Sequence, residues 1–104
     1  MISRIWHGWT TQENADKYEA LLRNEIFANI ANQSIRGYLG IHLLRRDVDE
    51  GVEFVTLMWF DDINAVRAFA GEQYETAVVP KEARLLLSRF DDVSAHYQVI
   101  ESPE

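Results

Sequence analysis

The stretch Tyr38–Phe60, YLGIHLLRRDVDEGVEFVTLMWF, contains two strand-like runs joined by a tight turn, and it decides the fold. The residues Asp49-Glu50-Gly51 predict a three-residue hairpin loop in which Gly51 takes the left-handed conformation. Because side chains alternate along a strand, one face then carries Tyr38, Leu44, Phe54, Met58 and Phe60. The other face carries Leu39, Ile41, Leu43, Val55, Leu57 and Trp59. The hairpin is therefore predicted to be apolar on both faces.

A sheet that is apolar on both faces needs cover on both faces. An antiparallel sheet with one wet face alternates apolar with polar residues, and this hairpin does not. The rest of the chain supplies enough helix for one face, and an exposed apolar patch above a few hundred Å² is rare in monomers. We expect a homodimer that pairs through the open sheet face. The alternative is a monomer with a flat apolar surface.

The residues before the hairpin predict a strand followed by a helix. Ile2–Trp9 is rich in β-branched and aromatic residues, and Thr10 precedes Glu13 by the spacing of a capping box. Apolar residues then recur at helical spacing at Ala15, Tyr18, Leu21, Leu22, Ile26 and Ile30. The helix is expected to end near the polar run at 32–34.

The residues after the hairpin predict two helices and a final strand. Asp61 or Asp62 caps a helix that ends at Gly71, and Pro80 is the expected first residue of a short third helix whose buried side is Ala83, Leu86 and Leu87. Residues 91–100 alternate as a last strand. The order β-α-β-β-α-(short α)-β predicts an α+β, ferredoxin-like fold, with a four-stranded antiparallel sheet and helices on one face. We expect one domain over residues 1–100 and a polar tail at 101–104.

The composition of the chain excludes several classes of binding partner and site. Its 104 residues carry 17 acidic and 10 basic side chains, a net charge of −7, which argues against nucleic-acid binding. No cysteine is present, so thiolate metal sites and disulfides are excluded. No apolar run reaches the ~20 residues of a membrane span, and the N-terminus resembles a strand rather than a signal peptide. We therefore expect a cytoplasmic protein.

Four segments resemble a known family. RIWHGWT (4–10), GYLGIHLLRR (37–46), FVTLMWFDDINAVRAFAGE (54–72) and HYQV (96–99) are similar to sequences of antibiotic biosynthesis monooxygenase-like proteins. The resemblance implies a dimeric α+β barrel, in which two ferredoxin-like sheets pack face to face, and we expect no cofactor. That superfamily includes cofactor-independent monooxygenases of aromatic polyketides, haem-degrading enzymes and stress-induced dimers. The haem ligand of the degrading enzymes lies on a helix, whereas His7, His42 and His96 fall on predicted strands, which disfavours haem degradation.

Histidines are the candidate catalytic groups, because a neutral imidazole exchanges protons near physiological pH. His7 and His96 fall on the first and last predicted strands, which are neighbours in this topology and can bring the two side chains together. The alternative is that each is packed within the sheet. No carboxylate stands at ligand spacing beside them, so we expect no metal site.

Aromatic residues and one arginine are the candidate substrate-binding groups. Trp9 and Trp59 are expected near one end of the sheet, where a cleft opens, and Tyr97 follows His96. Tyr74 falls in the loose segment 72–79, which is either a lid or a connector. Arg4, inside the first strand, either holds a substrate carboxylate or enolate or pairs with a carboxylate, such as Glu53 or one across the dimer. These residues favour an oxygenase of a small aromatic substrate, with a non-catalytic ligand-binding or stress-response dimer as the alternative.

Overall fold

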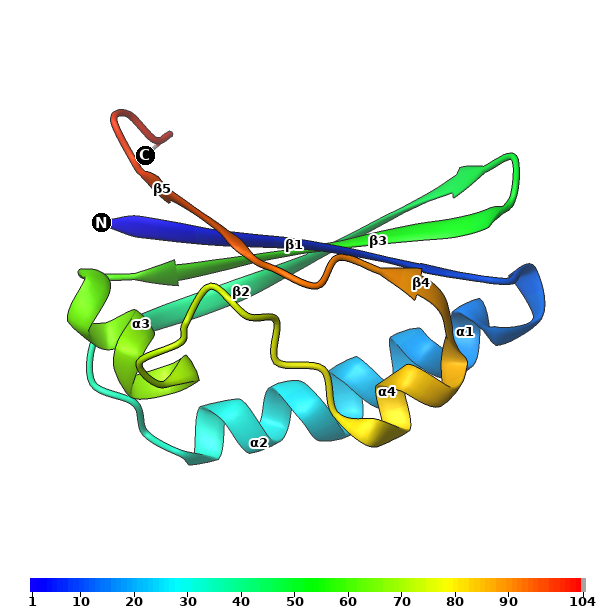
Figure 1. Cartoon of the computed structure of the whole chain (residues 1–104), viewed down its shortest axis with the longest axis horizontal. Coiled ribbons are helices and arrows are strands. Elements are labelled where there is room, and N and C mark those ends of the chain that lie inside the picture. The colour runs from blue at the N-terminus through cyan, green and yellow to red at the C-terminus, as the bar shows by residue number, and fades with distance from the viewer. Residues whose placement is uncertain (104) are drawn as a thin grey trace.

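The computed structural model describes residues 1–103 and contains one antiparallel sheet with its helices on a single face (Figure 1). In chain order the elements are β1 (Ile2–Thr10), α1 (Gln12–Leu21), the π-helix η1 (Leu22–Ile26), α2 (Phe27–Asn32), β2 (Tyr38–Val48), β3 (Gly51–Phe60), α3 (Ile63–Ala70), α4 (Lys81–Leu86), β4 (Leu87–Phe90) and β5 (Ala95–Gln98). The strands follow the order β2-β3-β1, and both β4 and β5 pair with β1. The predicted α+β fold is confirmed.

The outer edge beside β1 differs from the single strand predicted over 91–100. Leu87, expected on the short helix, begins β4, and the edge is interrupted at residues 91–94 before β5. At the interruption, the Asp91 N–H donates to the His7 carbonyl at 3.0 Å, and the Asp91 carbonyl accepts from Trp6 Nε1 at 2.7 Å. These bonds keep the backbone attached to β1. Residues 99–103 follow without helix or strand, and Glu104 of the expected tail lies outside the described residues.

The long N-terminal helix begins one residue later than predicted. Thr11 is its N-cap, because the Thr11 hydroxyl accepts from the Asn14 N–H, while Thr10 is the buried last residue of β1. The predicted apolar stripe is confirmed, since each of its residues is buried or half-buried. Asp62 caps α3, and Gly71 ends it at φ 87°. No helix within residues 1–103 is long and apolar enough to cross a membrane.

The hairpin between β2 and β3 is one residue tighter than predicted. Val48 pairs with Gly51, so the loop contains Asp49 and Glu50 alone. Gly51 has a φ of 144°, and a Cβ there would lie 2.1 Å from the Thr10 carbonyl oxygen, so the position requires glycine.

The shorter loop moves β2 by one residue relative to β3 and thereby exchanges its faces. Ile41 lies opposite Met58 and faces the helices, whereas Leu44 lies opposite Val55 on the open face. The predicted division of β2 into even and odd faces is therefore wrong from Ile41 onward. A bulge between Tyr38 and Gly40 returns Tyr38 to the predicted face, where it pairs with Phe60.

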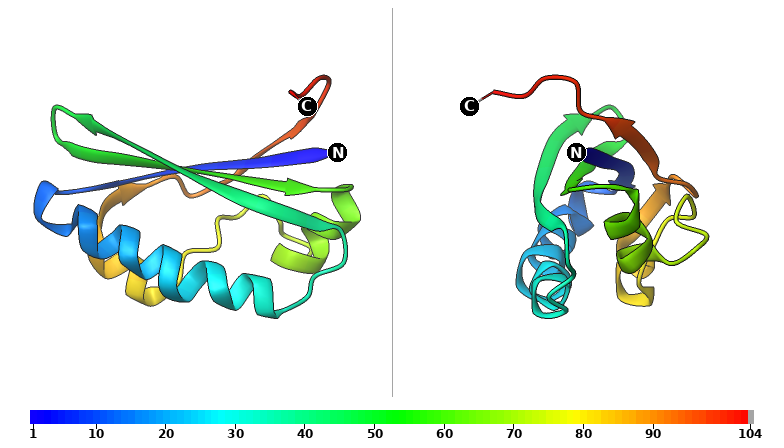
Figure 2. Two further views of the ribbon diagram at one scale, coloured as in Figure 1. Left: turned by 180° about the vertical axis from the view of Figure 1, so that it is seen from behind. Right: turned by 90° about the vertical axis from the view of Figure 1, so that its left-hand side faces the viewer.

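The buried core lies between the sheet and the helices in two clusters. One joins α1 and α4 to the end of the sheet near the hairpin loop, through Ala15, Tyr18, Leu22, Val52, Phe54 and Ala83. The other joins α2 and α3 to the opposite end, through Ile30, Met58, Phe60, Ala65 and Val66. Figure 2 shows that, in the described part of the chain, all helices lie on one face of the sheet and none covers the second face.

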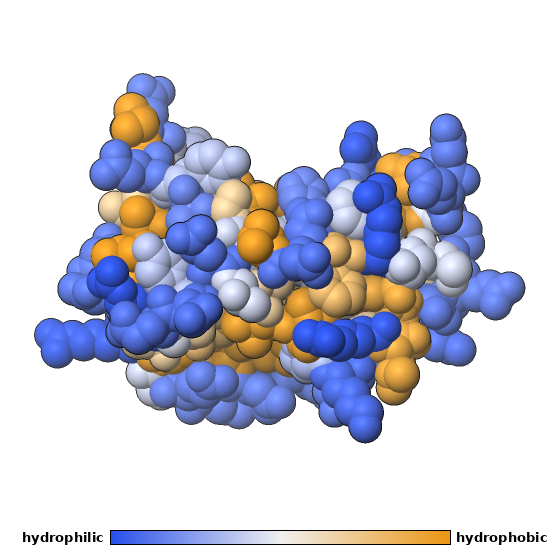
Figure 3. Space-filling view, in the orientation of Figure 1, coloured by the Kyte–Doolittle hydropathy of each residue, from blue (hydrophilic) through white to orange (hydrophobic). Residues whose placement is uncertain are grey.

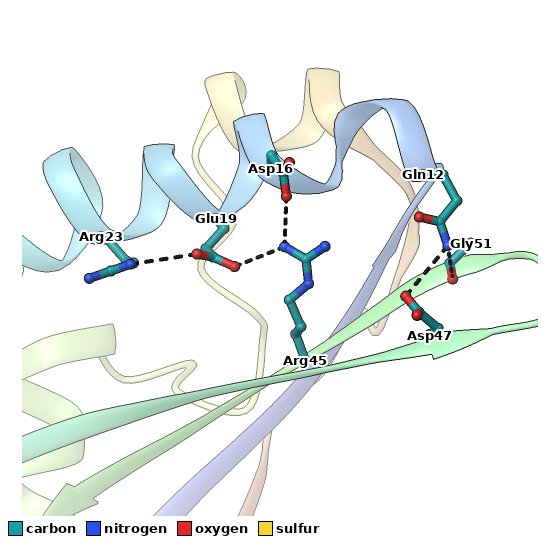
Figure 4. A network of polar contacts seen from close by, with 7 residues as sticks. All are labelled: Gln12, Asp16, Glu19, Arg23, Arg45, Asp47 and Gly51. Carbon is teal, nitrogen blue, oxygen red and sulfur yellow. Dashed lines mark hydrogen bonds and ion pairs between the residues drawn. The ribbon is translucent and has the colours of Figure 1, made fainter.

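Polar contacts also attach α1 to the hairpin (Figure 4). Arg45 Nη1 donates to Glu19 Oε1 at 2.8 Å and to Asp16 Oδ1 at 3.0 Å. The Arg45 guanidinium also lies 5.5 Å from the ring centre of Phe54. Because Arg45 belongs to β2 and both carboxylates belong to α1, these contacts hold the helix against the sheet and form one wall of the core.

Candidate functional site

A cavity lies within the core, between the sheet and the helices. This inner cavity has a volume of about 70 Å³, and its lining is apolar except for Arg4, Tyr18, Thr56 and Ser94. An outer groove of about 410 Å³ continues from it and shares the lining residues Ile26, Ile30, Phe69, Val78 and Pro80. Figure 3 shows apolar side chains gathered in this region. Cavity and groove together reach the ~300–1,000 Å³ typical of small-molecule sites.

The π-helix η1 forms part of the cavity wall. Leu22 and Ile26, its first and last residues, both line the inner cavity. Single π-turns inserted in a helix occur frequently at functional sites. The extra residue of this turn lies where α1 passes into α2, over the middle of the sheet (Figure 1). The helix therefore departs from regular geometry at the cavity.

Arg4 is the one cationic side chain that lines the inner cavity or the outer groove within residues 1–103. It is 3% exposed. Its Nη1 donates to the Tyr74 carbonyl at 2.5 Å, and its Nη2 donates to the Thr76 carbonyl at 3.4 Å. The guanidinium carbon lies 5.4 Å from the ring centre of Phe69. The arginine is thus held by carbonyl oxygens of the segment that joins α3 to α4.

No carboxylate within residues 1–103 forms an ion pair with Arg4. Glu53, which the sequence suggested as its partner, lies on the opposite face of the sheet. There it pairs with His7 and Arg46. Burial lowers the pKa of Arg4 to about 10, so the guanidinium is still charged at neutral pH. The cavity therefore contains a buried positive charge that hydrogen bonds satisfy but no carboxylate neutralises.

His96 lies beside Arg4, just outside the lining of the cavity. The Arg4 Nη1 and His96 Nε2 atoms are 2.9 Å apart, and because arginine can only donate, Nε2 accepts. This assigns the ring proton to Nδ1 and leaves the imidazole neutral. Burial and the charge of Arg4 lower the pKa of His96. The ring stands edge-on to Tyr74, with centroids 5.1 Å apart, and is not part of the cavity lining.

His7 does not meet His96. Side chains alternate along β1, so Arg4, opposite His96, faces the helices, while His7 faces the other way. His7 Nδ1 lies 2.9 Å from Glu53 Oε2, and Arg46 Nε donates to Glu53 Oε1 at 2.6 Å. The two candidate bases therefore belong to different faces and cannot act on one substrate within a single subunit.

Three aromatic candidates also lie on the open face. Trp9 stacks under the Arg89 guanidinium at 3.7 Å, and Trp59 Nε1 donates to His42 Nδ1 at 2.9 Å. Tyr97, on β5, is 56% exposed. The two tryptophans occupy opposite ends of the sheet because β1 and β3 are antiparallel, which corrects the expectation that they share one end. Of the aromatic candidates, Tyr74 alone lies on the side of the cavity.

Three hydroxyl groups of the cavity lining were not singled out from the sequence: those of Tyr18, Thr56 and Ser94. Tyr18 is the most informative, since it is 1% exposed and burial alone raises its pKa, without a side-chain hydrogen bond. The sequence signal was a hydroxyl inside an otherwise apolar helical stripe. Within residues 1–103, no group of three histidine or acidic side chains is placed to hold a metal ion.

Three solved structures share this fold. A Bacillus cereus protein assigned to the antibiotic biosynthesis monooxygenases aligns with a TM-score of 0.68 and 15% identity, over 100% of this chain and 95% of that one. A Deinococcus radiodurans protein with the same assignment gives 0.62 and 15%, over 100% and 97%. A Streptomyces coelicolor monooxygenase, ActVA-Orf6, in complex with the ligand nanaomycin D, gives 0.57 and 13%, over 99% and 92%.

The comparisons by sequence give no such match: no family model and no curated protein matches the chain. At 13–15% identity the structural likeness establishes the shape of the chain and the order of its elements. The resemblance read from the sequence is confirmed at that level. The chain has the fold of the antibiotic biosynthesis monooxygenase proteins.

Proposed function

We propose that the protein is a cofactor-independent oxygenase that acts, as a homodimer, on a small aromatic substrate. The observation that carries the proposal is the buried Arg4 guanidinium, which lines an apolar cavity and contacts a neutral imidazole just outside the lining. An apolar cavity with a few converging polar groups suits a planar ring. The positive charge stabilises a phenolate or enolate oxygen, the form of an aromatic substrate that releases electrons most readily.

In this mechanism His96 is the base and Arg4 is the stabiliser. The substrate hydroxyl enters beside Arg4 and takes the place of His96 Nε2 as acceptor of the Nη1 hydrogen bond. The hydroxyl proton moves to Nε2, and the resulting oxyanion remains on the guanidinium. Because the lowered pKa of His96 makes it a weak base, the transfer depends on Arg4 stabilising the oxyanion.

Oxygen then receives its electrons from the substrate anion itself. One electron passes from the anion to O₂, the two radicals combine into a C–O bond, and the O–O bond of the resulting hydroperoxide breaks. One oxygen atom stays on the ring carbon and the other leaves as water, so that a phenol and O₂ give a quinone and water. The protein contributes the anion, its orientation and a cavity that excludes bulk water.

The open face of the sheet supports the homodimer. Leu39, Leu44 and Tyr97 are each about half exposed there, around half-buried Ile5, Val55 and Leu57. Three polar residues of this face, His7, Glu53 and Arg46, already pair with one another. A second copy packed sheet to sheet removes the apolar side chains from water.

One observation favours a second function, ligand binding without turnover. His96 contacts Arg4 but does not line the cavity, so a bound ligand reaches the arginine before it reaches the base. A protein of this kind sequesters an aromatic ligand and leaves it unchanged. The two functions differ in whether oxygen is consumed.

Oxygen uptake separates them. We expect the wild-type protein to consume oxygen with a dihydroxynaphthalene under air, and His96→Ala to abolish at least nine-tenths of the rate while the ligand still raises the melting temperature. His42→Ala, a histidine of the open face, is the matched control and retains the rate. Binding without oxygen uptake in the wild-type protein would establish the second function and overturn the first.

A further inference from the structure

We infer that the inner cavity selects a singly charged aromatic anion, an acidic phenol or enol bound with its oxyanion on Arg4 and its uncharged remainder in the outer groove. The inference deepens the proposed function and rests on the same site. It adds the charge of the ligand, the position of that charge and the limit of one charge per ligand. Three features of the site lead to it.

The first feature is the uncompensated charge of Arg4. A buried charge is costly unless an opposite charge accompanies it, and carbonyl oxygens supply hydrogen bonds but no net charge. Arg4 has the carbonyls of Tyr74 and Thr76 and the nitrogen of His96. Glu75 lies close enough to act on the titration of His96, but it is exposed and forms no ion pair with Arg4. An anionic oxygen in the cavity supplies the missing charge.

The second feature is the set of hydroxyl groups that line the same cavity. Tyr18 is almost wholly buried on α1, and its hydroxyl has no side-chain partner, so it is free to donate to a ligand. Ser94, between β4 and β5, and Thr56, on β3, add two more hydroxyls to the lining. No carboxylate of residues 1–103 belongs to the lining. The polar groups of the inner cavity are therefore donors suited to an oxyanion.

The third feature is the charge of the outer groove, which is negative whereas that of the inner cavity is positive. Its charged lining residues are Glu25, on η1, and Glu82, on α4, and no lysine or arginine lines it within residues 1–103. The whole chain carries a net charge of −7, so its field repels anions at a distance. A second negative charge on the ligand would lie in the groove near these carboxylates, and no cationic side chain of the described lining would offset the repulsion. The site therefore accepts one negative charge, and accepts it at Arg4.

The size of the inner cavity sets the size of the charged part. A volume of about 70 Å³ admits the end of a single ring and excludes a fused tricyclic headgroup. The outer groove, at about 410 Å³, accommodates the remainder of a larger molecule. The ligand is therefore expected to enter with its acidic hydroxyl first.

The test is an anaerobic titration of the full chain with 4-nitrophenol, whose anion absorbs visible light. We expect the bound phenol to ionise at a lower pH than the free phenol and to bind at least tenfold more tightly than uncharged 4-nitroanisole. The doubly charged 4-nitrophenyl phosphate is expected not to compete. Equal binding of phenol and anisole, or a bound phenol that ionises at a higher pH, overturns the inference.

Two variants assign the effect to the named residues. Arg4→Gln should remove the preference for the anion, and Tyr18→Phe should weaken binding of 4-nitrophenol severalfold more than binding of 4-nitroanisole. If Arg4→Gln does not fold, Tyr18→Phe and the phosphate competition still decide the matter. An unchanged anion preference in both variants contradicts the assignment.

The failure of this inference and that of the proposed function are distinguishable, because the titration contains no oxygen. Anion-selective binding without any oxygen uptake under air overturns the oxygenase alone. Oxygen uptake with uncharged substrates, accompanied by no preference for the anion, overturns the charge selection alone.

Discussion

Arg4 and His96 lie opposite each other on paired strands, with Nη1 2.9 Å from Nε2. The register of β1 against β5 produces this contact, and it places a permanent cation beside an imidazole that must stay neutral to accept its hydrogen bond. Arg4 lines a cavity whose walls are otherwise almost entirely apolar, and His96 contacts Arg4 from outside that lining. The acid–base chemistry that we propose for the site follows from this single relationship.

The contact predicts a pH dependence of stability. The folded chain holds the pKa of His96 below the ordinary 6.5, whereas the unfolded chain protonates that histidine near 6.5. As the pH falls below 6.5, the unfolded state takes up a proton that the folded state refuses, so the free energy of unfolding decreases. We expect the melting temperature of wild type to fall more between pH 7 and pH 5.5 than that of His96→Asn. Parallel curves for the two proteins would contradict the neutral assignment.

The cluster on the other face predicts a loss of stability in the same direction, but at lower pH. Hydrogen bonds from His7 and Arg46 lower the pKa of Glu53, so this carboxylate stabilises the fold above its ordinary 4.5 and loses that contribution as the pH falls through the folded value. Glu53→Gln should lower the free energy of unfolding at neutral pH by about 2 kcal/mol and flatten the acid side of the stability curve. Denaturant unfolding at a fixed protein concentration measures both effects. Glu50→Gln, in the exposed loop, should change neither, and equal losses in the two variants would assign Glu53 no special role.

The open face of the sheet predicts a dimer, and a single charged substitution on that face should disrupt it. Wild type should sediment at about twice its 12.1 kDa monomer mass. Leu44 is 49% exposed on that face, and Leu44→Lys should shift the mass to that of a monomer, because a partner subunit would have to bury the charge. The matched control is Leu85→Lys on α4, which is 75% exposed on the helical side and should remain dimeric. A wild-type monomer at micromolar concentration would remove the dimer from this account.

The cavity predicts a variant that folds well and binds poorly. Ala83, at 2% exposure, belongs to the inner lining, and Ala83→Val places two additional methyl groups there. The melting temperature should stay level or rise, because the added groups fill empty space, while the stabilisation conferred by an aromatic ligand is lost. Thermal unfolding with and without 4-nitrophenol measures both. Retained ligand stabilisation would show that the ligand binds elsewhere.

The alternation and capping patterns predicted the element order, whereas the register of β2 depended on one residue of loop length. Gly51 was correctly expected to need positive φ, but it pairs with Val48 instead of standing in the loop. Its close approach to the Thr10 carbonyl, a contact distant in sequence, accompanies the tighter turn. The residues of the turn alone do not reveal that contact. The predicted loop was therefore one residue too long, and most side chains of β2 were assigned to the wrong face.

The site was predicted in part for the same kind of reason. Three of the predicted candidates lie together in the structure. Arg4 and His96 share one face of the sheet, and Tyr74 contacts both of them. The odd-numbered Trp9 and His7 follow the alternation of β1 to the other face, and attention to that alternation would have separated them from Arg4 at the outset. Tyr18 gave no such signal, because helical spacing shows that a residue is buried but not whether its hydroxyl finds a partner.

Turnover under ¹⁸O₂, with mass analysis of the product, tests whether this cavity directs oxygen onto a bound phenol. We expect a quinone that carries one ¹⁸O atom, with the second recovered as water, at a rate that His96→Ala abolishes and metal chelation leaves unchanged. A quinone without ¹⁸O, accompanied by hydrogen peroxide, would contradict it, as would a phenol that binds beside Arg4 and is recovered unaltered.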